Sequence, residues 1–188
     1  MRGAEAVVKK VRIIGRPAIA KIRMAKSYRI DKLDNKLRTE RTRSEARLLN
    51  KAKMAGVECP TVFEVSDFEI VMSFVNGKRP AMKGWEAIEA GRILAKLHGN
   101  DIIHGDYTPA NLICTNRDKR NSLIVIDFGL GYISKDIEDK AVDVFTMLRA
   151  IDKKMHQDFV KGYNDYTNAS DVISRVKIVE KRVRYAVV

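Results

Sequence analysis

The chain has 188 residues, of which 45% are hydrophobic and 32% charged, and its formal net charge is +12. This apolar content predicts a packed globular protein and excludes a disordered tail. No run approaches the ~20 apolar residues of a membrane helix, and the opening "MRGAEAVVKK" lacks the apolar core of a signal peptide. We therefore expect a cytoplasmic protein without a membrane segment, whose cysteines, Cys59 and Cys114, stay reduced.

The first 76 residues predict a meander of strands and one long helix. The expected strands cover residues 4–14, 17–23, 61–66 and 68–75. The first tight turn is expected at Gly15–Arg16. The helix is expected from about residue 33 to residue 55, and Gly56 ends it.

From residue 77 onward the pattern is mainly helical. Helices are expected at residues 83–98, 139–151, near Phe159, and at 169–187. A short hairpin is expected between the first two, with strands at residues 111–114 and 122–129. We therefore divide the chain into a strand-rich part, residues 1–76, and a helical part, residues 77–188.

The positive charge is concentrated in one segment. Residues 21–53 hold 12 of the 36 Lys and Arg residues and 4 of the 24 acidic residues. This excess indicates an anionic partner, and a solvated helical face is the alternative.

Four short motifs occur in an order that indicates phosphoryl-transfer chemistry. They are Lys21 in "AIAK", Glu45 on the long helix, Asp106 and Asn111 in "HGDYTPAN", and Asp127 in "IDFG". Each motif alone is weak, because a strand lysine or an Asp-Phe-Gly tripeptide often arises by chance. Together they match the strand lysine, helix glutamate, catalytic loop and D-F-G of protein kinases. This resemblance predicts an α+β, minimal protein-kinase-like bilobal fold, with an antiparallel sheet and one long helix in a small N-lobe and a reduced helical C-lobe.

The chemistry needs these residue types. Phosphoryl transfer is catalysed mainly by positioning and by neutralising charge on the phosphates. Lys21 supplies a point charge for the α- and β-phosphates of ATP. Asp127 and Asn111 offer hard oxygen ligands for Mg²⁺. Asp106 is placed to orient the attacking hydroxyl or water and to accept its proton.

Two glutamates compete for the role of holding Lys21. Glu45 lies three, four and seven residues before Leu48, Leu49 and Ala52, so it shares their apolar helix face. Glu40 is rotated away from that face. We therefore expect Glu45 to point toward the sheet and Glu40 toward solvent.

The stretch "IVMSFVNG" fits an adenine-binding hinge. Met72 is expected to close the back of the nucleotide pocket, and the main chain of Ser73 and Val75 is expected to bind the purine. A plain buried strand is the alternative interpretation of these residues.

The chain departs from ordinary protein kinases in three ways. No G-x-G-x-x-G motif precedes the strands, so a short "GAEA" turn with Gly3 is the expected lid over the phosphates. The catalytic loop reads H-G-D, without the usual arginine. The next helix follows Asp127 so closely that an activation segment for docking peptides has no room.

These departures resemble one family: the small atypical serine/threonine kinase/ATPase subunit of the archaeal and eukaryotic KEOPS complex. The similar blocks are "GAEA", "YRIDKLDNKLRTERTRSEARLL", "AGVECPTV", "IVMSFVNG", "HGDYTPANLI" and "IDFGLGYIS", which cover nearly the whole chain. The resemblance implies ATP and Mg²⁺ as cofactors and a role in threonylcarbamoylation of adenosine in tRNA. It implies the threonylcarbamoyl-transfer subunit and two small accessory subunits as partners, with tRNA bound through the basic surface. It also allows for a chain that is half of a fusion with the transfer subunit.

Two other functions remain open at this level. The first is a small-molecule phosphotransferase of the aminoglycoside or choline kinase type, which also uses H-G-D, although only some 45 residues follow Asp143 here. The second is an RNA-binding pseudokinase scaffold. The sequence leaves open whether the phosphate acceptor is water, a partner or the chain itself.

Overall fold

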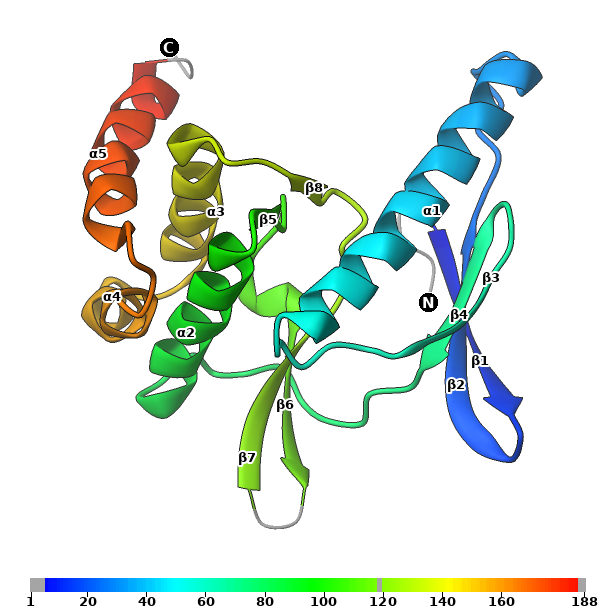
Figure 1. Ribbon diagram of the computed structural model, residues 1–188, viewed down its shortest axis with the longest axis horizontal. Helices are drawn as coiled ribbons and strands as arrows, with labels where there is room; N and C mark the ends of the chain where they lie inside the picture. The colour runs from blue at the N-terminus through cyan, green and yellow to red at the C-terminus, as the bar shows by residue number, and fades with distance from the viewer. Residues whose placement is uncertain (1–5, 118–119, 186–188) are drawn as a thin grey trace.

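The computed structural model describes residues 6–117 and 120–185 and shows two lobes (Figure 1). A four-stranded antiparallel sheet and one long helix form the N-lobe. Its elements are β1 (Ala6–Ile13), β2 (Arg16–Arg23), α1 (Asp31–Met54), β3 (Val62–Val65) and β4 (Glu69–Ser73). The N-lobe stands at one side of the molecule and helices α2–α5 at the other. This arrangement confirms the α+β, kinase-like fold class expected from the sequence.

The sheet has the strand order β1-β2-β4-β3, which places β2 and β4 at its centre. The β1–β2 turn was predicted one residue too late. Ile13 pairs with Arg16, so the turn consists of Ile14 and Gly15, whose φ values are 47° and 74°. Two left-handed residues in succession match the twist of a two-residue hairpin. The sequence concealed this turn, because a β-branched residue rarely adopts a positive φ.

Helix α1 follows the prediction within two residues at either end. It ends before Gly56, whose φ of 75° is the left-handed conformation common after a helix. One of its faces is buried along much of its length, and the buried residues are Asp34, Thr42, Glu45, Leu48, Leu49 and Ala52. This face positions Glu45 in the interior.

The C-lobe contains four α-helices, two short strand pairs and two 3₁₀ turns in its described residues. Its elements are α2 (Trp85–Gly99), β5 (Ile102–Ile103), η1 (Pro109–Asn111), β6 (Leu112–Arg117), β7 (Arg120–Val125), β8 (Tyr132–Ile133), α3 (Ile137–Ala150), η2 (Lys153–Met155), α4 (His156–Tyr163) and α5 (Ala169–Tyr185). The four predicted helices are all present. The hairpin strands β6 and β7 run farther toward their turn than predicted, and β7 ends at Val125, two residues before Asp127.

Helix α2 packs closely against α4 because a glycine lies at the contact on each helix. A Cβ atom at Gly91 would collide with the carbonyl of Phe159, and one at Gly162 would collide with the carbonyl of Ile88. Only glycine allows the two backbones to approach this far. The close packing fixes α2, the helix that lies beneath the catalytic loop.

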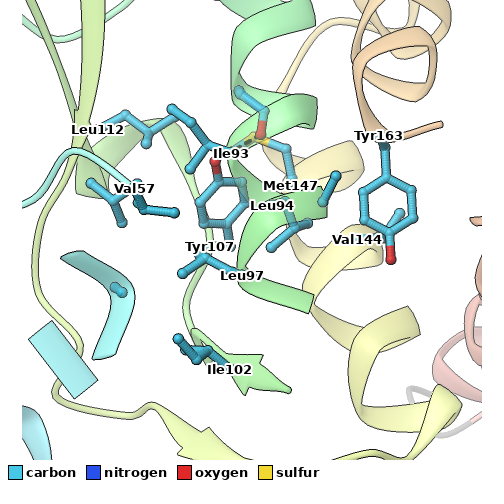
Figure 2. Packing of buried hydrophobic residues seen from close by; sticks show 14 of the residues in the cluster. Val57, Ile93, Leu94, Leu97, Ile102, Tyr107, Leu112, Val144, Met147 and Tyr163 are labelled. Atoms are coloured by element: carbon cyan, nitrogen blue, oxygen red, sulfur yellow. Dashed lines mark hydrogen bonds between the residues drawn. The ribbon is translucent and has the colours of Figure 1, made fainter. Parts of the chain in front are cut away.

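The larger of two hydrophobic clusters among the described residues runs through both lobes. Figure 2 shows part of it, with Leu94 of α2, Tyr107 of the catalytic loop and Val144 of α3 packed together. Tyr107 is fully buried, and its hydroxyl donates a hydrogen bond to the carbonyl of Ala90. The loop that carries Asp106 is therefore anchored in the core. Within residues 6–117 and 120–185, no helix combines the length and the apolarity that a membrane span needs.

Candidate active site

Lys21 joins the two lobes through a pair of carboxylates. Its Nζ atom lies 2.6 Å from Glu45 Oε1 on α1 and 2.6 Å from Asp127 Oδ1 in the C-lobe. Lys21 lies inside β2, paired with Val8 and Ile70. Neighbouring strands on both sides fix its backbone, so its ammonium group is held at a defined point.

Glu45, and not Glu40, is the glutamate that contacts Lys21. The Glu45 side chain is 1% exposed, whereas that of Glu40 is 59% exposed and lies 3.9 Å from Lys36. The five-residue separation on a helix of 3.6 residues per turn rotates the two side chains well apart. The apolar face of α1 therefore determines which glutamate enters the site.

Arg23 is a second cation at this site that the sequence analysis did not identify. Its Nη2 atom lies 2.5 Å from Glu45 Oε2, so Glu45 binds Lys21 with one carboxylate oxygen and Arg23 with the other. Arg23 is also near the D-F-G turn, because a Cβ atom at Gly129 would lie 3.3 Å from its Nη2. The available signal was the Lys-x-Arg spacing, which places both side chains on one face of a strand.

Asp127 is held in a left-handed backbone conformation with a φ of 64°. Its Oδ1 atom accepts hydrogen bonds from Lys21 and from the Gly129 N–H, at 2.6 and 3.1 Å. Partial burial opposes ionisation, but the Lys21 ammonium and the Gly129 N–H outweigh it and lower the pKa of Asp127. Asp127 is therefore an ionised, half-exposed carboxylate.

Asp106 and Asn111 contact each other within the catalytic loop. The Nδ2 atom of Asn111 donates to both the carbonyl oxygen and Oδ2 of Asp106, each at 2.8 Å. The 3₁₀ turn η1 bends the chain between them. Since the amide nitrogen of Asn111 faces Asp106, its Oδ1 atom remains as an oxygen donor for a cation.

His104 braces this loop through both nitrogens of its ring. Its Nε2 atom lies 3.2 Å from the carbonyl of Ile126, and the Asp106 N–H lies 3.3 Å from its Nδ1. A carbonyl only accepts, so Nε2 carries the proton and Nδ1 accepts. Burial lowers the pKa of His104, in keeping with this neutral form. The histidine thereby ties the residue before Asp127 to Asp106.

Asp143 on α3 is a further support that sequence reasoning missed. It is 1% exposed and accepts the N–H groups of His104 and Gly105, at 2.6 and 2.9 Å. His98 Nε2 lies 3.4 Å from the same carboxylate. In the sequence, the indication of this role was that the helical pattern places the acidic residue Asp143 on the buried face of its helix. Asp143 fixes the backbone from which Asp106 projects.

The expected hinge residues lie at the end of β4 and just after it. Met72 is buried, 4% exposed, as a residue at the back of a pocket would be. The Ser73 N–H donates to the carbonyl of Thr61 at 2.9 Å, so the expected purine contact of Ser73 is restricted to its carbonyl oxygen. Val75, whose N–H is the other expected purine contact, lies two residues beyond the end of β4. Gly77 then packs so closely against the carbonyl of Cys114 that a larger residue would collide with it.

Two further expectations concern the surroundings of the site. Gly3 and most of the "GAEA" lid lie outside the described residues. The segment between Asp127 and α3 is short, as expected, because α3 begins at Ile137. Within it, β8 pairs with β5 directly beside the catalytic loop. The described chain therefore forms no peptide-docking shelf there.

Comparison with known proteins identifies related chains over nearly the full length. The family model described as RIO domain matches residues 6–147. A protein from Archaeoglobus fulgidus, named probable serine/threonine-protein kinase BUD32 homolog, is 36% identical over 97% of this chain and 94% of its own length. A probable bifunctional tRNA threonylcarbamoyladenosine biosynthesis protein from Methanosarcina mazei is 35% identical over 98% of this chain. The chain spans only 35% of that bifunctional protein.

The fold is similar to that of a solved kinase structure. The complex of the Rio2 kinase from Chaetomium thermophilum with ADP, Mg²⁺ and phosphoaspartate aligns with a TM-score of 0.67, over 99% of this chain and 70% of the other. The sequence identity is 15%, so this likeness supports the fold alone.

Proposed function

The chain belongs to the RIO domain family, in the group that includes the BUD32 homologue of Archaeoglobus fulgidus, and we propose that it is an ATP-dependent phosphotransferase or ATPase. We propose further that it is the kinase-like subunit of the KEOPS complex and supports threonylcarbamoylation of adenosine in tRNA. The names of its relatives support this role. Serine/threonine kinase activity is part of the proposal.

The observation that carries the proposal is the placement of Lys21 between Glu45 and Asp127 (2.6 Å to each). A lysine held by a helix glutamate is positioned to bind the α- and β-phosphates, and a carboxylate across from it is positioned to face a phosphate-bound cation. An RNA-binding scaffold without nucleotide chemistry has no need of this arrangement. The group to which the chain belongs also favours the tRNA role over phosphorylation of a small molecule.

The oxygen donors fit magnesium. Asp127 supplies an ionised, half-exposed carboxylate, and Asn111 supplies an amide oxygen. In residues 6–117 and 120–185, no cluster of three or more His, Cys, Asp or Glu side chains forms a metal cage. A small number of protein oxygens is typical of Mg²⁺ sites in which the substrate phosphates supply further ligands. When bound, Mg²⁺ neutralises charge on the β- and γ-phosphates.

Asp106 is the proposed general base. Its contact with Asn111 and the support of its loop by His104 and Asp143 fix the direction of its carboxylate. In this role Asp106 orients the attacking hydroxyl or water and takes its proton as the new bond to phosphorus forms. The short segment after Asp127 favours water, the chain itself or a partner protein over free peptides as the acceptor.

The nucleotide base is proposed to lie against the hinge. The Ser73 carbonyl and the Val75 N–H offer one acceptor and one donor for adenine, with Met72 behind it. Gly3 is proposed to cover the phosphates. The lobe boundary is proposed between residues 76 and 77, where the chain passes from the hinge to Gly77 and the Lys78–Cys114 backbone pair.

The partners and location are proposals as well. We propose that the threonylcarbamoyl-transfer subunit and the small accessory subunits bind this chain, and that tRNA meets its basic surface. The two cysteines are free thiols, which fits the reducing cytoplasm that we propose as its location.

The test is magnesium-dependent ATP binding and turnover by the purified chain, alone and with the transfer subunit and tRNA. We expect Mg-ATP binding by the chain alone and faster turnover in the assembly. Asp127→Ala should largely abolish the metal-dependent binding. Equal ATP affinity and equal metal dependence in the variant would refute the assignment of this site.

A further inference from the structure

Two cations and two carboxylates form one charged network where the lobes meet. Glu45 binds the Lys21 ammonium with Oε1 at 2.6 Å and the Arg23 guanidinium with Oε2 at 2.5 Å. Lys21 also binds Asp127 Oδ1 at 2.6 Å. The charges of these four groups sum to zero. Arg23 is the member of the network that has no role in the proposed chemistry of phosphate, metal or proton.

The centre of this network is Glu45, whose side chain is only 1% exposed. A carboxylate removed from water needs cations or hydrogen-bond donors at both of its oxygens. Lys21 faces one oxygen and Arg23 faces the other. Loss of either partner leaves part of a buried charge uncompensated, which favours orientations that return the carboxylate to water. The buried orientation of Glu45 therefore depends on both cations.

Lys21 is a partner that Glu45 has to share with phosphate. Its ammonium already divides its contacts between Glu45 and Asp127, and it is the proposed ligand of the α- and β-phosphates. ATP brings several negative charges to this point. A compact ammonium on a flexible stem is drawn toward them, and its contact with Glu45 weakens as its contact with phosphate strengthens. Lys21 alone therefore cannot keep Glu45 neutralised while a nucleotide is bound.

Arg23, in contrast, is fixed at both ends. Its backbone N–H donates to the carbonyl of Phe68 at 2.8 Å, and its own carbonyl accepts from Arg38 Nη1 at 3.2 Å. Its side chain is 5% exposed, and a guanidinium keeps its proton at any pH that the fold survives. Arg23 is therefore the partner that can hold Glu45 when the Lys21 ammonium turns to phosphate.

The D-F-G turn shows how closely the network converges. A Cβ atom at Gly129 would lie 2.9 Å from Asp127 Oδ1, 3.3 Å from Arg23 Nη2 and 3.5 Å from Lys21 Nζ. A side chain at residue 129 would push these groups apart. The guanidinium of Arg23 thus lies at this turn although its side chain is buried, and its charge acts at the same point as those of Lys21 and Asp127.

We propose that Arg23 is a positioning residue for phosphoryl transfer. It holds Glu45 in the buried orientation and keeps this carboxylate neutralised while the Lys21 ammonium binds the phosphates. Arg23 acts through Glu45 and does not touch the nucleotide. This role rests on the proposed function, because it belongs to the same site. Without Arg23, Lys21 must neutralise Glu45 alone, and its contact with the phosphates weakens.

The first experiment compares the binding of Mg-ATP and of adenosine by titration calorimetry. Arg23→Gln is the test variant, and Arg12→Gln is the matched control, because it removes an exposed arginine from the neighbouring strand of the same sheet. We expect Arg23→Gln to bind adenosine as the wild type does but Mg-ATP about 10-fold more weakly, the usual effect of weakening one charged contact. The control should bind both ligands as the wild type does. An equal loss of affinity for both ligands in Arg23→Gln would assign Arg23 to the support of the fold and overturn the proposal.

A double-mutant cycle on ATP turnover tests whether Arg23 acts through Glu45. Misplacing a positioning group by about 1 Å can lower a rate by about 10²-fold, so we expect Arg23→Gln to lower turnover at saturating Mg-ATP by about 10–10²-fold. In the Glu45→Gln background the same change should have little further effect, because the carboxylate that Arg23 holds is already absent. Equal effects in the two backgrounds would show that Arg23 acts independently of Glu45 and overturn the proposal.

Arg23→Lys covers the case in which the glutamine disturbs folding. It keeps the charge but removes the planar fork, so we expect it to fold, to bind adenosine as the wild type does and to turn ATP over faster than Glu45→Gln. Turnover as slow as that of Glu45→Gln would show that a positive charge at residue 23 is not what the site requires, which also contradicts the proposal.

These measurements separate the role of Arg23 from the proposed function. A wild type that does not bind Mg-ATP refutes the assignment as a phosphotransferase or ATPase, and the role of Arg23 with it. A wild type that binds and turns over Mg-ATP, with a folded Arg23→Gln variant that does so equally well, refutes the role of Arg23 alone.

Discussion

Lys21 and Asp127 are 106 residues apart in the chain, yet Lys21 Nζ lies 2.6 Å from Asp127 Oδ1. Lys21 belongs to the sheet of the N-lobe, and Asp127 follows the last strand of the C-lobe hairpin. The contact links the two lobes at the point where phosphates are proposed to bind. It also lowers the pKa of Asp127, so the carboxylate is ionised before any cation arrives.

Replacing Glu45 tests whether this geometry matters for turnover. Glu45→Gln removes the charge that binds both Lys21 and Arg23, so Lys21 loses one of its two fixed partners. Misplacing a positioning group by about 1 Å can lower a rate by about 10²-fold, and we expect an effect of that order on ATP turnover. Glu40→Gln on the same helix is the matched control and should have no effect. Similar rates for both variants would remove Glu45 from the site.

Asp106→Asn tests the proposed general base. The amide preserves the shape of the side chain and its place beside Asn111 but cannot accept the proton. We expect Mg-ATP binding to persist and turnover to fall by about 10²–10⁴-fold, the usual contribution of a general base. A parallel loss of binding would show that Asp106 holds the loop together, and full activity would exclude it from the mechanism.

Much of this site was predictable because it depends on local patterns. The strand with Lys21, the apolar face that orients Glu45 and the loop with Asp106 and Asn111 all follow from spacing along the chain. Arg23 and Asp143 were missed for a physical reason. Burial of an arginine or an aspartate is decided by partners far away in sequence, such as Glu45 for Arg23 and the catalytic-loop amides for Asp143.

The same distinction explains the errors in the fold. Helix α1 was placed well because it is long, periodic and followed by glycine. The β1–β2 turn was misplaced because its register is set by pairing along the whole hairpin, which draws Ile14 into a left-handed conformation. The main chain of Ser73 was expected to bind the purine, and the hydrogen bond from its N–H to the carbonyl of Thr61 leaves its carbonyl oxygen for that contact.

We expect generic peptides to be poor substrates. Residues 128–136 alone separate Asp127 from α3, and β8 within them is paired with β5. No segment remains there to bind a peptide in an extended form. Phosphorylation assays with several unrelated peptides should show transfer far slower than ATP hydrolysis in the assembled complex. Efficient phosphorylation of unrelated peptides by the isolated chain would contradict this expectation.

The stability of the fold should decrease in mild acid because of its buried histidines. Burial lowers the pKa of His98 below its ordinary value of 6.5, against the opposing effect of Asp143. Below pH 6.5 the unfolded chain therefore binds more protons than the folded one, and the free energy of unfolding falls as the pH drops toward the folded pKa. His104 contributes in the same direction.

Urea unfolding between pH 7.5 and 5.5 measures this loss. His98→Gln should reduce the difference in the free energy of unfolding between the two pH values, whatever it does to stability at pH 7.5. An unchanged pH dependence in His98→Gln would show that His98 does not titrate differently in the folded and unfolded chain.

The outer face of α1 is the proposed contact for tRNA, formed by Lys36, Arg43, Arg47 and Lys51. All four side chains are exposed, and the ion pair between Arg43 and Asp67 is itself at the surface and worth little. Each phosphate contact releases counterions, so the logarithm of affinity should fall with the logarithm of salt by roughly 0.7–0.9 per phosphate. Base specificity is not expected, because no stacking platform or recognition helix is evident in the sequence.

Reversing the charge of Arg43 and Arg47 to glutamate tests this face. We expect weaker tRNA binding by the assembled complex and a shallower salt dependence, because fewer phosphates are engaged. ATP binding should not change, because Glu45, which contacts Lys21, lies on the buried face of α1 and not on this exposed face. If the salt slope is the same in the reversed variant and the wild type, the outer face of α1 does not contact tRNA phosphates.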